Sequence, residues 1–132
     1  MTVNVEFHYH QSGFRRRHFD RWIALGRSNR LLADELWFVR GYASDQAEPL
    51  MRRRIFVRLD WQNALLKYLD LGVVSFIDPL DRSALAQLSV QYAVSKHWTL
   101  GVHAPGVFGA SNREKGSLPR AENTVLQIIR YF

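Results

Sequence analysis

Acidic and imidazole side chains near the amino terminus recur at every second position. Glu6, His8 and His10 follow this spacing within residues 3–10. A two-residue spacing places side chains on one face of an extended strand. Two imidazoles and a carboxylate could ligate a divalent metal, but no second cluster completes such a site. We therefore predict no metal and no cofactor, and we expect the three side chains to face water.

A second polar set lies within residues 54–62. Arg54, Arg58 and Asp60 share one face of that segment, opposite Ile55, Val57, Leu59 and Trp61. Charged side chains in the middle of a strand need a wet surface, because burying an unpaired charge is costly. We expect this face, like that of residues 3–10, to line an aqueous space.

Arginine supplies 15 of the 18 basic side chains, which oppose 12 acidic ones. Residues 11–58 hold 11 arginines and five acids, a balance of +6 that equals the net charge of the whole chain. The planar guanidinium binds phosphate and carboxylate through paired hydrogen bonds. Two arginine runs lie within this segment, one near each end of the long loop. They supply the candidate polyanion-binding residues Arg15, Arg16, Arg17, Arg52 and Arg53.

Composition and motifs exclude several classes of function. Cysteine is absent, which excludes disulfides, thiolate nucleophiles and iron–sulfur clusters. No apolar run approaches the roughly 18 residues of a membrane-spanning helix. The set His97, His103, Asp78, Asp81 and Ser83 has no nucleophile-elbow context, and no phosphate-binding glycine loop is present. We therefore predict that the protein is not an enzyme.

Alternating apolar and polar residues predict the elements that position these side chains. The period of two marks strands, and spacings of three and four residues over 14–43 favour one or two helices. The helices would break around residues 26–28, with Ser28 as an N-cap, although 36–42 could also be a strand. Residues 105–123 are rich in Gly, Ser, Pro and charge, which predicts a loop. The expected strands span residues 3–10, 54–62, 68–77, 84–94, 98–104 and 124–132.

Two-faced strands of this length, joined alternately by short turns and long loops, are typical of membrane β-barrels. The slightly negative mean hydropathy agrees, because it averages the two faces. We predict an all-β fold, an antiparallel membrane β-barrel segment of about six strands. A long, partly helical, arginine-rich loop spans 11–51 and lies outside or in the lumen. Tyr92 and Trp98 lie near strand ends and are expected at the membrane interface.

The carboxy-terminal half carries a family resemblance. Three stretches, LAQLSVQYAVSKHWTLGV, FGASNREKGSLP and TVLQIIRYF, resemble the last strands of porin-like outer-membrane β-barrel proteins of Gram-negative bacteria. The resemblance implies that the terminal Phe132, with Leu126, Ile128 and Tyr131, forms a signal for the barrel-assembly machinery. Arg130 departs from the pattern, since an apolar or aromatic residue is usual there.

The resemblance also implies a location and partners. It places the chain in the bacterial outer membrane, in contact with lipid and lipopolysaccharide, as a channel or transport-type barrel that passes small or anionic solutes. Six strands do not close a barrel, because about eight is the minimum for one chain. We expect residues 1–132 to be the carboxy-terminal part of a longer barrel domain whose signal peptide lies upstream, unless several copies share one barrel.

The alternative is a soluble, basic α+β domain that binds nucleic acid. It would use the arginines of 11–58, with Trp22, Trp37 and Phe38 as stacking groups. However, these arginines are not interleaved with exposed aromatics on strands, and the apolar strand faces would need a covering layer. The favoured interpretation involves no nucleic acid.

Overall fold

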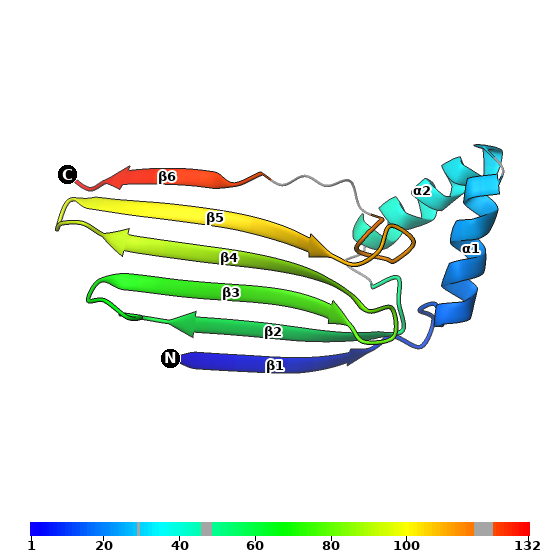
Figure 1. Cartoon of the computed structure of the whole chain (residues 1–132), viewed down its shortest axis with the longest axis horizontal. Coiled ribbons are helices and arrows are strands. Elements are labelled where there is room, and N and C mark those ends of the chain that lie inside the picture. Colours follow the sequence, from blue (N-terminus) through cyan, green and yellow to red (C-terminus); the bar gives the residue numbers. More distant parts are fainter. Residues whose placement is uncertain (29, 46–48, 118–122) are drawn as a thin grey trace.

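Six strands form one antiparallel sheet in the order of the sequence (Figure 1). The computed structural model describes residues 1–28, 30–45, 49–117 and 123–132. The expected six antiparallel strands are confirmed, and the sheet is open, with the first and last strands as its edges. The strands are β1 (Thr2–Tyr9), β2 (Arg53–Trp61), β3 (Leu69–Asp78), β4 (Ser83–Ala93), β5 (Trp98–Phe108) and β6 (Val125–Arg130).

The strand register sorts the side chains of the sheet onto two chemically different faces. On the first, which we call the apolar face, the row Trp61, Leu71, Val90, Val102 and Leu126 crosses five strands without a polar residue. The exceptions on this face are Ser75 and Gly106, together with Arg53 and Arg130 at strand ends. Its other members include Val3, Val5, Phe7, Tyr9, Ile55, Val57, Leu59, Leu69, Val73, Ile77, Leu88, Tyr92, Trp98, Leu100, Phe108 and Ile128.

The opposite face, which we call the polar face, changes character along the strands. Towards the β2–β3 and β4–β5 turns its rows are hydrophilic, as in Asp60, Gly72, Ser89 and His103. Towards the other end of the sheet, which we call the loop end, apolar side chains take over. The row there is Phe56, Phe76, Leu85 and Val107.

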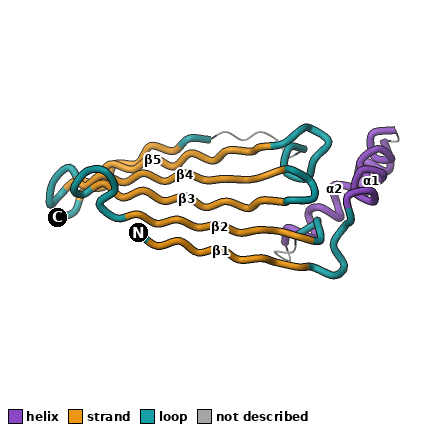
Figure 2. The backbone as a smooth tube through the Cα atoms, turned by 60° about the horizontal axis from the view of Figure 1, so that its bottom comes forward, coloured by secondary structure: helices purple, strands orange, loops and turns teal. Residues whose placement is uncertain are grey.

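Two helices lie beyond the loop end of the sheet and cover neither face (Figures 1 and 2). They are α1 (Arg16–Ser28) and α2 (Arg30–Asp45), and they pack against each other. Within the described parts of the chain, neither helix packs against a strand. Neither is long and apolar enough to cross a membrane.

The helical interpretation of 14–43 is confirmed, and a strand over 36–42 is wrong. Ser28 closes the last turn of α1, where its hydroxyl donates to the Leu25 carbonyl, so it is not the predicted N-cap. The predicted loop from residue 105 is also partly wrong, because β5 continues to Phe108. Among the described residues, β6 pairs with β5 only as far as His103. Pro105 therefore lies on a locally unpaired edge, where its missing amide proton is tolerated.

The buried apolar side chains lie outside the sheet. Among the described residues they are Phe19, Ala43, Met51 and Ala64. Phe14 forms a parallel bridge with Met51, and its ring packs on Phe19 and Trp22. The chain exposes 9632 Å², whereas a compact protein of this mass exposes about 7200 Å². A one-layer sheet exposes both of its faces, and no second layer covers this one in the part of the chain that the structure describes.

Candidate functional site

The apolar face of the sheet is open to the surroundings. Leu126 is 77% exposed and Ile128 is 69% exposed, and Val5, Phe7 and Leu88 are exposed as well. Because no helix in the described ranges covers them, these side chains form a continuous apolar surface from one edge of the sheet to the other. An apolar patch of this extent marks a surface for lipid or for another protein.

Aromatic rings lie at both ends of the apolar face. Trp61, Tyr92 and Trp98 are near the turns, and Tyr9 and Phe108 are at the loop end. Trp98 and Phe108 are ten residues apart on β5, which is about 34 Å along a strand. A tilt of about 40° reduces this to about 26 Å, close to the height of the apolar band of a membrane barrel. The two interface candidates, Tyr92 and Trp98, thus lie at the same end of the apolar face.

The residues of the proposed assembly signal lie at the edge strand β6 and just after it. Leu126 and Ile128 are on the apolar face, and the amide of Tyr131 donates to the His97 carbonyl at 2.8 Å. Arg130, the residue that departs from the family pattern, lies between two rings. Its guanidinium is 5.4 Å from the Trp98 centroid and 4.8 Å from that of Phe132. Cation–π contacts thus partly offset the cost of placing the Arg130 charge on the apolar face.

Most of the predicted water-facing residues lie on the polar face, as the alternation requires. Glu6 accepts from Asn4 at 2.8 Å and contacts His8 at 2.9 Å. Arg58 and Asp60 form an exposed ion pair at 2.6 Å. Beside this pair is a shallow depression over Gly72, to which sequence reasoning gave no role. The other polar residues that line it are Gln62, Asp70, Ser89 and Gln91.

Two of the predicted residues lie at the loop end. Arg54 is on the polar face opposite His8, and its guanidinium is 3.5 Å from the Glu114 carboxylate and 5.7 Å from the Phe76 centroid. His10 lies beyond β1, and its amide donates to the Arg52 carbonyl while its ring contacts Ser12. Glu6, His8 and His10 therefore do not converge, and the described residues contain no group suited to a metal ion.

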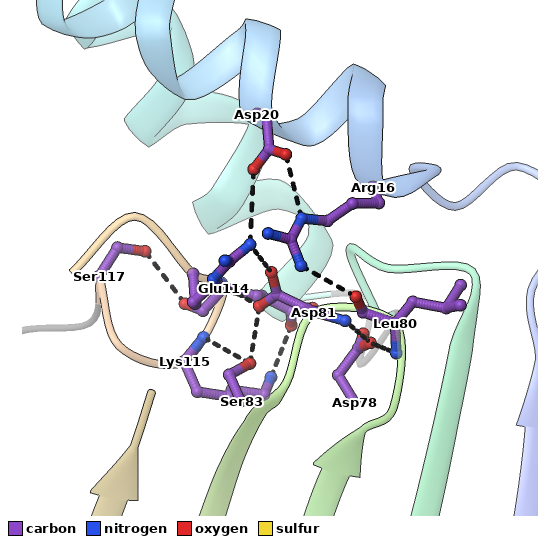
Figure 3. A network of polar contacts seen from close by, with 10 residues as sticks. Arg16, Asp20, Asp78, Leu80, Asp81, Ser83, Glu114, Lys115 and Ser117 are labelled. Atoms are coloured by element: carbon purple, nitrogen blue, oxygen red, sulfur yellow. Dashed lines mark hydrogen bonds and ion pairs between the residues drawn. The ribbon is translucent and has the colours of Figure 1, made fainter. Parts of the chain in front are cut away.

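A buried polar network joins two loops at the loop end, and we call it the loop-end cluster (Figure 3). Asp81 is fully buried, and its Oδ2 accepts from the Ser83 hydroxyl at 2.7 Å and from the Glu114 amide at 2.6 Å. The Glu114 carboxylate pairs with Lys115 at 2.6 Å. Sequence reasoning grouped Asp81 with Ser83 but missed their link to Glu114, because Glu114 lies 33 residues beyond Asp81 in the chain.

The loop-end cluster also fixes the helices. Arg16 donates to Asp20 and to the Leu80 carbonyl, both at 3.0 Å (Figure 3). From α2, Arg40 donates to the Glu114 carbonyl and to the Ser117 hydroxyl. Burial lowers the pKa of Arg40, and the charge of Glu114 opposes that shift. The helix pair is therefore held to the loops by charged hydrogen bonds.

The two arginine runs, 15–17 and 52–54, lie side by side in space. The amide of Phe14 donates to the Leu50 carbonyl at 2.7 Å, and the amide of Arg52 donates to the Phe14 carbonyl at 3.1 Å. Arg16 and Arg52 are engaged, since Arg52 also donates to the Gln11 carbonyl. The polyanion candidates that stay exposed are Arg15, Arg17 and Arg53.

The chain was compared with protein-family models, with curated proteins and with solved structures. None of the three comparisons finds a match to this chain. What the candidate surfaces do must therefore be argued from their geometry.

Proposed function

We propose that this chain forms part of the wall of an outer-membrane β-barrel of the channel or transport type. The apolar face of the sheet carries the proposal, because it crosses all six strands and neither of the two described helices covers it. Lipid tails can cover such a face without a second protein layer. Antiparallel strands with one lipid-facing and one water-facing side are the structure that a bilayer accepts.

In this proposal the polar face lines the aqueous lumen, through which small solutes pass. In the described part of the chain its acidic side chains outnumber its arginines, since Glu6, Asp60 and Asp70 oppose Arg58, and Arg54 is paired with Glu114. Any preference for anionic solutes would therefore arise at the loop end, from the exposed Arg15 and Arg17, because Arg53 is on the apolar face opposite Tyr9. The same arginines are suited to the phosphates of lipopolysaccharide.

The nucleic-acid alternative is less well supported. Trp22, one of its three proposed stacking groups, packs against Phe14 with ring centroids 5.2 Å apart. Arg16 and Arg52 are half-buried and donate to backbone carbonyls, so they present less of their guanidinium groups to a phosphate than an exposed arginine does. A soluble domain would also leave the apolar face in water, which the hydrophobic effect opposes.

The proposal is tested by placing one charge on either face of β4. Leu88 is on the apolar face near the middle of the strand, and Ser89 is on the polar face. An arginine on the lipid face at the bilayer centre costs about 2–4 kcal/mol. We expect Leu88→Arg to lower partitioning into lipid vesicles at least about 30-fold, measured by flotation. The matched Ser89→Arg variant should partition like the unmodified chain.

Equal partitioning of the two variants would contradict the proposal, as would an unmodified chain that stays in solution without vesicles. In that second case, salt-dependent binding to single-stranded DNA would favour the nucleic-acid alternative.

A further inference from the structure

A cleft of about 390 Å³ lies between α1, α2 and the loop 109–117. Its apolar walls include Trp22, Leu36 and Trp37. Trp22 is held in place by its stacking on Phe14, whereas Trp37 is 55% exposed. This volume, together with a mainly apolar, aromatic lining and a few polar groups, is typical of sites for small organic ligands.

Both charged residues that line the cleft are arginines. Arg27 is exposed, and its Nη2 donates to the Ser111 carbonyl at 3.1 Å. Arg40 lies over the Trp37 ring at 5.6 Å from the centroid. The charge of Glu114 acts on Arg40, but its carboxylate is paired with Lys115 and Arg54. The cleft is therefore positively charged beside aromatic walls.

We propose that this cleft binds a small aromatic carboxylate. The flat ring would lie against the indoles of Trp22 and Trp37, and the carboxylate would accept hydrogen bonds from Arg27 and Arg40. The site does not depend on the barrel proposal, because every residue that lines it lies outside the strands.

Three probes separate the contributions of charge and ring. The full chain, refolded in micelles, is titrated with 2-naphthoate, its neutral analogue 2-naphthalenemethanol, and the non-aromatic cyclohexanecarboxylate. Tryptophan fluorescence and calorimetry report binding. We expect 2-naphthoate to bind at least about tenfold more tightly than either of the other two, because only this probe uses both the guanidinium groups and the ring faces.

Two arginine variants locate the site. Arg27→Gln should weaken 2-naphthoate binding about tenfold, whereas Arg53→Gln, which removes an equal charge from the exposed start of β2, should leave it unchanged. Trp37→Leu should weaken binding of both naphthalene probes and leave vesicle partitioning as it was. Far-UV circular dichroism checks that each variant folds.

Three outcomes overturn the proposal. The first is no binding of 2-naphthoate up to roughly 10 mM. The second is equal affinity for 2-naphthoate and its neutral analogue, which leaves an apolar cleft without anion recognition. The third is an Arg53→Gln variant that loses as much affinity as Arg27→Gln. The barrel proposal would survive all three, since vesicle partitioning measures it separately.

Discussion

At the scale of single residues, Asp81 has the largest predicted effect on stability. Its buried carboxylate accepts from the Glu114 amide and the Ser83 hydroxyl. Asp81→Ala would leave both donors buried and unpaired, and each such group costs about 1–3 kcal/mol. We expect a loss of about 3 kcal/mol in the free energy of unfolding, measured by urea denaturation of the refolded chain.

Asp34 in α2 provides the control for this prediction. Its side chain is exposed, so Asp34→Ala should unfold at the same urea concentration as the unmodified chain. A normal midpoint for Asp81→Ala would show that the two loops do not need this carboxylate.

The sequence predicted the position of a side chain correctly where strand alternation alone determines it. It failed where a partner from a distant part of the chain determines it. The spacing of Arg58 and Asp60 placed both on one face, and they lie there as an ion pair. Arg54 has the same spacing, but it pairs with Glu114, 60 residues further along the chain. Periodicity carries no signal for such a contact, because it describes one strand and not the loop that folds onto it.

At the scale of elements, the crossing of the two helices depends on one glycine. A Cβ on Gly26 would collide with the Leu36 side chain, whereas a Cβ on Gly41 would meet nothing within 4 Å. We expect Gly26→Ala to destabilise the helix pair by about 1–3 kcal/mol. Gly41→Ala should stabilise it by up to about 1 kcal/mol, because alanine favours helix.

Both variants make the same chemical change, so thermal unfolding followed by the helical circular dichroism signal compares them directly. The structural account fails if the two glycines respond alike, since intrinsic helix propensity alone predicts a gain at both positions.

The sequence predicted elements best where a period lasts for a whole strand. The two-residue alternation over 84–94 corresponds to β4, and the three- and four-residue spacing over 14–43 corresponds to α1 and α2. The boundaries were harder, because they depend on neighbours. β5 passes through Pro105 since β6 stops short of it among the described residues. Ser28 closes a turn where its residue type suggested a start.

At the scale of the whole molecule, the four tryptophans report on the orientation of the sheet. Trp61 and Trp98 lie on the apolar face near the turns, and Trp22 and Trp37 lie in the helices. If the apolar face contacts lipid, lipids brominated near the headgroups should quench the tryptophan fluorescence of single-tryptophan variants that keep Trp61 or Trp98. Variants that keep Trp22 or Trp37 should be quenched mainly by aqueous iodide.

This pattern follows from the preference of indole for the membrane interface. Equal quenching of all four tryptophans by iodide would indicate that the apolar face stays in water. Trp22, which packs on Phe14, should respond to iodide less than Trp37.

Among the described strands, none pairs with the outer edge of β1 or of β6. Neither β1 nor β6 contains a proline or a lysine, the residues with which soluble sheets often block their edges. The apolar face also extends to both edges, through Val5 and Phe7 on β1 and Ile128 on β6. The sheet is therefore suited to continue into a wider wall of the same two-faced kind.

The strictly sequential strand order has a consequence for the time course of folding. Four of the five strand pairings join segments separated by turns or by one loop of moderate length, whereas β1 and β2 must meet across about 40 residues. Closing that segment costs about 2 kcal/mol more than closing a four-residue turn. We therefore expect β3, β4 and β5 to pair first, as successive hairpins. We expect β1 to pair with β2 later, after the helix pair and the Phe14–Met51 bridge have brought the two strands close together.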